Sequence, residues 1–480
     1  MLEDIPPPSA FFLGGTIVLN GPDEHAEVPA CFRWLNAKWR CPAVHYRDVR
    51  LWLKEAGIRN TIPRWQNVSL TLHDERDPHP YQAEALQAWL AADCWGSVVL
   101  PTGAGKTFLA LKAIAECSVS ALVVVPTLDL LHQWYARLEN AFETPIGVWY
   151  GQEKRLEPLT VTTYPSAWAQ AETLGNQFRL LVFDEIHHLP APSWHEIALM
   201  CAAPYRLGLT ATYPEREPLK PERGRTSGKE SLQLFTQAIG GPAALLDKLV
   251  GPVVYRKQID DLTGRQLADY RTECIRVDLT SEERAVYDSA YDTYTGYVRE
   301  ARLRERHGAG WWDEMTRRSA YEAGARRAKV AELKLKDIVH QAAGKLLVLD
   351  KLLREHHNQH ILIFTAHNRF AYQIARRHLL PVITHQTKAA ERKAILEQFQ
   401  AGTYRAIVTS KVLNEGVDVP EAKIAIVLGG SASAREYVQR LGRVLRKQGN
   451  AQAILYEVIA RKTVDERIAR QRRPRLKAYA

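Results

Sequence analysis

The sequence has few cysteines, and they are not spaced as in common metal or disulfide motifs. It contains six cysteines among 480 residues and no Cys-x-x-Cys pair, which excludes a zinc ribbon and argues against a disulfide framework. Cys31, Cys41 and His45 lie close together, but their spacing is poor for zinc, so a structural role is expected. The other cysteines are Cys94, Cys117, Cys201 and Cys274.

The sequence also lacks a segment long and apolar enough to cross a membrane. The apolar run at 121–126 is only strand-sized, and residues 1–8 have neither a basic n-region nor an apolar h-region. We therefore expect a soluble, cytoplasmic protein without a membrane partner.

Basic residues exceed acidic ones. Lys and Arg number 64 against 54 Asp and Glu, and the pI is near 9.2. This surplus suggests a polyanionic partner such as nucleic acid, although many basic proteins bind none. The length is sufficient for roughly two to four domains with hydrophobic cores.

Strand and helix patterns alternate in two long blocks. Apolar runs predict strands at 97–100, 121–125, 159–163, 180–183 and 205–209, and again at 361–365, 406–410 and 424–428. Such alternation is typical of parallel sheets covered by helices on both faces. We predict an α/β fold with two similar parallel-sheet lobes and a strongly helical stretch at 281–343.

Residues 1–72 precede these blocks. Their pattern predicts a small α+β unit, with a strand within 15–21 and an amphipathic helix at 46–56. Cations alternate with aromatic residues in this unit. The mixture fits a surface that grips phosphates and stacks on bases, and equally fits a small core with a solvated rim. These residues are Arg33, Trp34, Lys38, Trp39, Arg40, Tyr46, Arg47, Arg50 and Trp52.

A glycine-rich loop at 101–107 follows the strand at 97–100 and precedes a helical run. Strand, glycine loop and helix form the setting of a phosphate-binding loop. Its glycines let backbone N–H groups close around phosphate oxygens, its lysine meets the β- and γ-phosphates, and its last hydroxyl binds Mg²⁺. The predicted ATP-binding residues here are Thr102, Gly103, Ala104, Gly105, Lys106 and Thr107, although Leu100 stands where the consensus has glycine.

Two adjacent carboxylates, Asp184 and Glu185, follow the buried strand at 180–183. Ligands bind at the carboxyl ends of strands in open α/β sheets. Alone, the pair is as consistent with a surface turn as with a metal site. Together with the upstream phosphate loop, it predicts that Asp184 holds hydrated Mg²⁺ and Glu185 polarises the attacking water.

Two further elements fit a nucleotide site. Gln82, one helix ahead of the loop, has an amide that can pair with the donor and acceptor of an adenine edge. Arg440, Arg443 and Arg446 recur at a three-residue spacing, on one helical face, where their charges repel unless an anion is bound. Arginine side chains that contact the transferred γ-phosphoryl group increase the rate of phosphoryl transfer by about 10³–10⁵-fold.

Taken together, the motifs resemble those of superfamily 2 helicases, and among them the compact archaeal or bacterial form of the XPB family of DNA repair and transcription helicases. The resemblance covers nearly the whole chain. The motifs lie at 101–107, 124–127, 161–164, 184–188, 208–212, 363–365, 409–420 and 439–446. It implies two RecA-like lobes, at 73–258 and 259–480, with a thumb-like insertion at about 281–343.

The resemblance assigns roles to the matching positions. Thr210 and Thr212 would couple hydrolysis to lobe movement, and His187 would link the nucleotide site to DNA-contacting elements. Gly416 and Asp418 would contact nucleotide, while Gln439, Arg443 and Arg446 would act in catalysis. The implied contacts with the DNA backbone, which carry no sequence information, are Pro126, Thr127, Thr163, Thr365 and Thr409.

Three other features of the family are less regular here. Arg216 and Glu217 match an Arg-Glu-Asp element implicated in opening duplex DNA, but Pro218 replaces its aspartate. The insertion carries arginines suited to gripping DNA, and its Trp311 and Trp312 would stack or fill a core. Residues 1–72 occupy the place of the family's damage-recognition domain.

The sequence therefore predicts a Mg²⁺- and ATP-dependent DNA helicase or translocase, 3′–5′ by resemblance, that acts in nucleotide excision repair on single-stranded, duplex or forked DNA. Three alternatives stay open. One is a duplex translocase that does not separate strands, another an ATP-switched damage scaffold for a structure-specific nuclease, and the third an RNA-directed motor.

Overall fold

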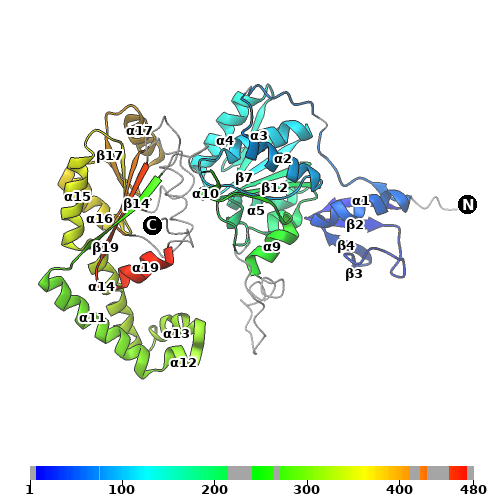
Figure 1. The fold of residues 1–480 in the computed structure, drawn as a ribbon. Helices are drawn as coiled ribbons and strands as arrows, with labels where there is room; N and C mark the ends of the chain where they lie inside the picture. Colours follow the sequence, from blue (N-terminus) through cyan, green and yellow to red (C-terminus); the bar gives the residue numbers. More distant parts are fainter. Residues whose placement is uncertain are drawn as a thin grey trace, which may run out of the picture. The chain divides into compact units, whose positions relative to one another are not determined.

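The computed structural model describes residues 7–66, 68–74, 76–191, 193–214, 241–262, 270–410, 422–429 and 453–472. The chain divides into two compact units, Met1–Asp261 and Leu262–Ala480. The first unit contains a five-stranded and an eight-stranded sheet, and the second contains a six-stranded sheet (Figure 1).

The five-stranded sheet has the order β3-β4-β2-β1-β5 and packs one face on helix α1. Its inward residues include Ile17 and Leu19, which meet Val49 and Leu53 of the helix. Trp39 and Trp52 pack against the same core, so these aromatics support the small-core interpretation. The elements are β1 Ser9–Leu13, β2 Thr16–Asn20, β3 Arg33–Leu35, β4 Lys38–Pro42, η1 Ala43–His45, α1 Tyr46–Glu55 and β5 Arg59–Asn60.

Residues beside this small sheet, in α1 and after β5, contact the part of the same unit that contains the eight-stranded sheet. The Arg47 guanidinium donates to the carbonyl of Asp93 at 3.2 Å and lies 5.0 Å from the Trp95 ring centroid. The Asn176 amide donates to the carbonyl of Ile62 at 2.8 Å. The domain boundary near residue 72 stays a prediction.

The eight-stranded sheet has the order β13-β6-β12-β11-β7-β10-β8-β9, and every neighbouring pair except β8–β9 is parallel. β7 and β10 are wholly buried, and both are predicted to the residue. β7 is uniformly apolar, whereas β10 combines Leu159 and Val161 with threonines, which favour strands. The strands are β6 Trp95–Val99, β7 Ala121–Val125, β8 Ile146–Tyr150, β9 Glu153–Arg155, β10 Leu159–Thr163, β11 Leu180–Asp184, β12 Tyr205–Thr210 and β13 Val253–Arg256.

Helices precede, connect and follow these strands. They are α2 Pro80–Ala91, α3 Lys106–Cys117, α4 Leu128–Ala141, α5 Tyr164–Ala169, α6 Ala171–Leu174, η2 Ile186–His188, α7 Glu196–Met200, α9 Gly241–Leu249 and α10 Ile259–Leu262.

The second unit repeats the parallel α/β plan, with strand order β14-β19-β18-β15-β17-β16. The predicted second lobe is therefore confirmed. Its strands are β14 Tyr270–Val277, β15 Ile361–Phe364, β16 Val382–Ile383, β17 Ala406–Thr409, β18 Ile424–Val427 and β19 Ala453–Ala460. Within the described parts of the chain, no helix is long and apolar enough to cross a membrane.

The predicted helical stretch is a set of helices that follows β14. A capping box between Thr280 and Glu283 starts it. Trp311 and Trp312 pack against the hydrophobic core of the unit, and the Lys329 ammonium lies 3.6 Å from the Trp312 ring centroid. The helices of the unit are α11 Ser281–Glu300, α12 Leu303–His307, η3 Gly308–Gly310, α13 Trp311–Arg318, α14 Ala323–Gln341, α15 Ala343–Glu355, α16 Asn368–His378, α17 Ala389–Gln400 and α19 Val464–Arg472.

A buried ion pair between Lys345 and Asp465 joins α19 to α15 within the second unit. Loss of this pair should be strongly destabilising. Lys345 is fully buried, and its ammonium donates to Asp465 Oδ2 and to the Leu428 carbonyl, both at 2.7 Å. Lys345→Met leaves Asp465 buried without its cation, which should cost about 3–5 kcal/mol of unfolding free energy. Chemical denaturation measures this loss.

The double variant Lys345→Met/Asp465→Leu removes both charges and should recover much of the lost stability. Lys351→Met, at an exposed position of the same helix, is the matched control. A Lys345→Met protein as stable as this control would contradict the account.

Candidate functional site

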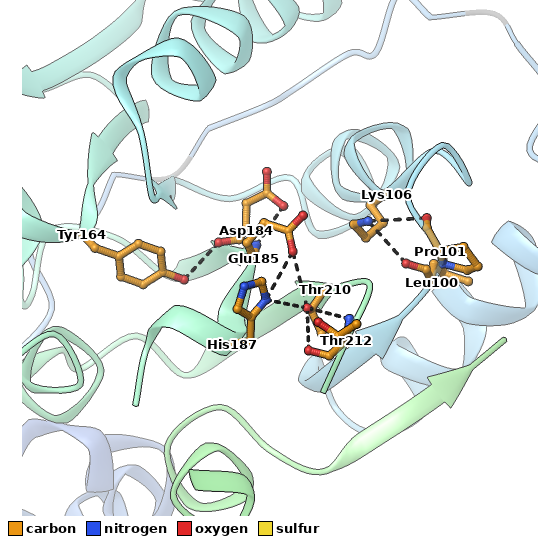
Figure 2. Close-up of polar contacts among 9 residues, drawn as sticks. All are labelled: Leu100, Pro101, Lys106, Tyr164, Asp184, Glu185, His187, Thr210 and Thr212. Atoms are coloured by element: carbon orange, nitrogen blue, oxygen red, sulfur yellow. Dashed lines mark hydrogen bonds and ion pairs between the residues drawn. The ribbon is translucent and has the colours of Figure 1, made fainter. Parts of the chain in front are cut away.

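The predicted nucleotide-site residues meet at the carboxyl ends of neighbouring parallel strands. In the order β6-β12-β11-β7-β10, the glycine loop follows β6, Thr210 ends β12 and Asp184 ends β11. The register pairs Asp184 with Leu209 and Thr210 with Val99. The glycine loop, Thr210 and Asp184 are therefore adjacent (Figure 2). The residues after β7 and at the end of β10, predicted to contact DNA, continue the same edge.

The loop between β6 and α3 has the geometry of a phosphate cradle. Gly103 and Gly105 have φ values of 85° and 74°, which side-chain-bearing residues rarely adopt. A Cβ at Gly105 would also collide with the amide nitrogen of Gln82. The loop ends at the N-terminus of a 12-residue helix, whose exposed N–H groups favour an anion.

Two side chains of the loop are placed to bind an anion. The Lys106 ammonium donates to the carbonyls of Leu100 at 3.3 Å and Pro101 at 3.4 Å, folded over its own loop (Figure 2). The hydroxyl oxygen of Thr102 is buried and has no hydrogen-bond partner among the described residues. A buried polar atom beside a glycine loop and a lysine fits a phosphate chain.

Asp184 is a buried carboxylate whose orientation is fixed. Its Oδ2 accepts from Trp134 Nε1 at 2.8 Å and its Oδ1 from the Glu185 amide at 3.0 Å, while the Tyr164 hydroxyl donates to its carbonyl at 3.0 Å. Burial and the adjacent Glu185 carboxylate raise the pKa of Asp184, opposed by Trp134 and Lys106. A hard divalent cation would favour the ionised pair, so these oxygens suit Mg²⁺.

Glu185, His187, Thr210 and Thr212 form one hydrogen-bonded group, the Glu185–Thr212 network. The Thr210 hydroxyl shares a hydrogen bond of 2.9 Å with His187 Nδ1, and that nitrogen lies 3.4 Å from Glu185 Oε2. The Thr210 hydroxyl has one proton and two acceptors besides, Thr212 O at 3.0 Å and Glu185 Oε2 at 3.4 Å (Figure 2). It can donate to only one acceptor at a time, and His187 Nδ1 can donate or accept according to its tautomer, so the network can exist in more than one arrangement.

Replacing Thr210 by valine keeps its shape and removes this hydroxyl. We expect nucleotide affinity to stay within about twofold, and the DNA-stimulated turnover number to fall about 10–100-fold, because a hydrogen bond to a charged group is worth about 1.5–3 kcal/mol. Steady-state ATPase assays with nucleotide-binding titrations measure both. Thr173→Val, on an exposed position of α6, is the control, and a Thr210→Val enzyme with normal turnover would refute the role.

Gln82 contacts the loop rather than open space. Its Oε1 accepts from the His79 amide at 2.9 Å, and its Nε2 donates to the Ala104 carbonyl at 3.0 Å. The side chain therefore ties the start of α2 to the phosphate loop, and an adenine contact, which stays a prediction, would require these bonds to exchange.

The predicted DNA-contacting threonines lie at strand ends but use their hydroxyls within the protein. Thr127 and Thr163 cap helices α4 and α5, accepting from Leu130 N and Ser166 N. Thr365 and Thr409 are fully buried and donate to the carbonyls of His367 and Ser410. Contacts with DNA at these positions, and at Pro126, stay predictions and would use mainly backbone groups.

Sequence reasoning gave no role to three residues of the site, Trp134, Arg137 and Tyr164, although Tyr164 ends the motif at 161–164. Arg137 Nη1 donates to Thr107 Oγ1 at 2.8 Å. No local pattern marked Trp134 and Arg137, because their contacts join positions far apart in the sequence. Throughout the described ranges, no group of three His, Cys, Asp or Glu side chains forms a metal site. Cys31 and Cys41 are free thiols, and their structural role stays a prediction.

Several predicted residues lie outside the residues that the structure describes. They are Arg216, Glu217, Pro218, Gly416, Asp418, Gln439, Arg440, Arg443 and Arg446.

The fold and the site define a helicase-type ATPase with two parallel-sheet lobes. Two family models match it, "Type III restriction enzyme, res subunit" over residues 75–215 and "Helicase conserved C-terminal domain" over residues 344–448. The chain is 39% identical over 432 residues to the "DNA 3′-5′ translocase XPB2" of Sulfurisphaera tokodaii, covering 90% of this chain and 92% of that protein. The chain belongs to the XPB family.

Bacterial relatives are more distant and longer. The "DNA 3′-5′ helicase XPB" of Kineococcus radiotolerans is 29% identical, covering 82% of this chain and 61% of that protein. The protein of the same name from Mycobacterium tuberculosis is 28% identical, covering 84% and 64%. Among solved structures, the Hef helicase domain of Pyrococcus furiosus has 18% identity and a TM-score of 0.48, covering 82% of this chain and 98% of that one.

Proposed function

We propose that the chain is an ATP-driven 3′–5′ DNA translocase that opens duplex DNA in DNA repair. The observation that carries this is the meeting of the phosphate loop, the Asp184–Glu185 pair and Thr210 at adjacent strand ends. The names of the XPB relatives supply DNA as the substrate and 3′–5′ as the polarity.

The residues of the site have separate roles in ATP hydrolysis. Backbone N–H groups of the glycine loop and Lys106 bind the phosphates, and Thr107 and Asp184 would hold Mg²⁺. When bound, Mg²⁺ would neutralise the charge that develops on the β- and γ-phosphate oxygens. Glu185 orients the attacking water. The hydrogen bonds of the Glu185–Thr212 network change when that carboxylate binds the water.

The remaining assignments are part of the same proposal. Residues 1–72 form an N-terminal domain, 73–258 the ATP-binding lobe and 259–480 the second lobe, which contributes Gly416, Asp418, Gln439, Arg443 and Arg446. Backbone contacts along strand ends suit a motor that moves on any sequence. A nuclease partner, suggested by resemblance alone, is testable by co-purification with the full chain.

The main rival is a duplex translocase that does not separate strands, favoured by Pro218. Fork unwinding and displacement of a triplex-forming strand, measured beside ATPase on the same DNA, decide between them. We expect all three activities. Triplex displacement and ATPase without fork unwinding would favour the rival.

A scaffold that uses ATP only as a switch is the second alternative. Glu185→Gln should keep ATP binding and remove hydrolysis. If DNA repair in cells carrying this variant were normal, the scaffold would replace the motor as the function.

A further inference from the structure

Helix α4 contacts both side chains predicted to bind Mg²⁺, although no motif role accounts for these contacts. Trp134 Nε1 donates to Asp184 Oδ2 at 2.8 Å, and Arg137 Nη1 donates to Thr107 Oγ1 at 2.8 Å. Three residues apart, Trp134 and Arg137 share a face of this 14-residue helix. Their targets come from two other elements, the end of β11 and the start of α3.

These contacts hold the metal donors in place. Trp134 is 1% exposed, so its ring has no freedom to turn away from Asp184. Each Asp184 oxygen already accepts one hydrogen bond, which sets the direction of the lone pairs left for a metal. Partners that orient metal ligands in this way typically contribute 10–100-fold in metal affinity.

The other end of α4 is the segment predicted to contact DNA. Pro126 and Thr127 directly precede the helix, and the Thr127 hydroxyl caps it by accepting from the Leu130 amide. Leu131 and Leu138 are buried on the core side, so the helix is held along its length. Trp134 lies two turns from the cap, about 10 Å along a rigid axis.

We infer that Trp134 and Arg137 are positioning residues for Mg²⁺, and that α4 transmits DNA contact at its first turn to the metal donors. This inference rests on the proposed function and names how DNA regulates the same site. Coupling of this kind is reciprocal: if DNA strengthens Mg–nucleotide binding, Mg–nucleotide strengthens DNA binding by the same factor.

The test measures binding, without hydrolysis. A non-hydrolysable ATP analogue is titrated into wild type, Trp134→Phe and Arg137→Met over a range of Mg²⁺ concentrations, with and without DNA. We expect Mg²⁺-free nucleotide affinity to stay within about twofold and the Mg²⁺ midpoint to rise about tenfold or more. The ratio of DNA affinities with and without Mg–nucleotide should fall toward one, with DNA affinity alone unchanged.

Matched substitutions elsewhere in the first unit control for loss of an indole or a guanidinium. Trp168→Phe removes an exposed indole that donates to Glu196, and Arg155→Met removes an exposed arginine; both should behave as wild type. Arg137 is only half-buried, so its variant carries the test alone if Trp134→Phe does not fold.

Unchanged Mg²⁺ midpoints in both variants overturn the inference. A raised midpoint with an unchanged affinity ratio overturns the transmission through α4. In either case, DNA-stimulated ATP hydrolysis by the wild-type protein supports the proposed function. If the wild type showed no such hydrolysis, the proposed function would be overturned, and the measured Mg²⁺ and nucleotide affinities would still stand.

Discussion

Glu185→Gln should lower the maximal ATP hydrolysis rate at saturating DNA by about 10³-fold, within the 10²–10⁴ range typical of general acid–base catalysis. The amide cannot take a proton from water, but it keeps the size of glutamate and one oxygen for the Glu185–Thr212 network. Phosphate contacts from the loop and Lys106 are untouched, so ATP affinity should change little. Steady-state ATPase and nucleotide-binding titrations measure the two quantities.

The control for this substitution is Glu172→Gln, the same change on an exposed position of α6. It should hydrolyse ATP at the wild-type rate. A Glu185→Gln enzyme that retained more than about a tenth of that rate would mean that another group orients the water.

Arg206→Leu should destabilise the first unit by about 4 kcal/mol or more, because buried acceptors left without donors cost about 1–3 kcal/mol each. Arg206 is fully buried and donates to four backbone carbonyls. Its guanidinium lies 4.8 Å from the Trp95 ring centroid, and burial lowers its pKa to about 10. The carbonyls belong to Ala198, Cys201, Ala203 and Leu249.

Chemical denaturation of the full chain measures the effect. Arg155→Leu, an exposed arginine in the same unit, should change the midpoint little. Arg206→Lys keeps a cation but loses the planar fork, so an intermediate loss is expected. A loss below about 1 kcal/mol for Arg206→Leu would show that the carbonyls find other donors or water.

Buried strands were predicted more accurately than edge strands. β7 and β10 are wholly buried, and the apolar run of β7 and the β-branched residues of β10 predict their bounds to the residue. β14 was missed because charged residues such as Arg271, Glu273 and Arg276 interrupt it, at the edge of its sheet. Its partner β19 lies nearly two hundred residues away, and no local pattern reports such a pairing.

The site shows the same division. That Lys106 follows a glycine loop and that Asp184 and Glu185 lie at the end of a neighbouring strand could be predicted from the motifs, and their roles stay predictions. Trp134 and Arg137 could not be predicted in this way, because their roles arise from contacts with residues 50 and 30 positions away. A tryptophan and an arginine within an amphipathic helix are otherwise ordinary core and surface residues.

The most direct measurement of the central claim is ATP hydrolysis in the presence of single-stranded, duplex and forked DNA and of RNA, with Lys106→Ala as the blank. The account predicts hydrolysis stimulated by DNA irrespective of base sequence, weaker stimulation by RNA, and no rate above background for Lys106→Ala. Hydrolysis that ignores DNA, or that survives in Lys106→Ala, would contradict it.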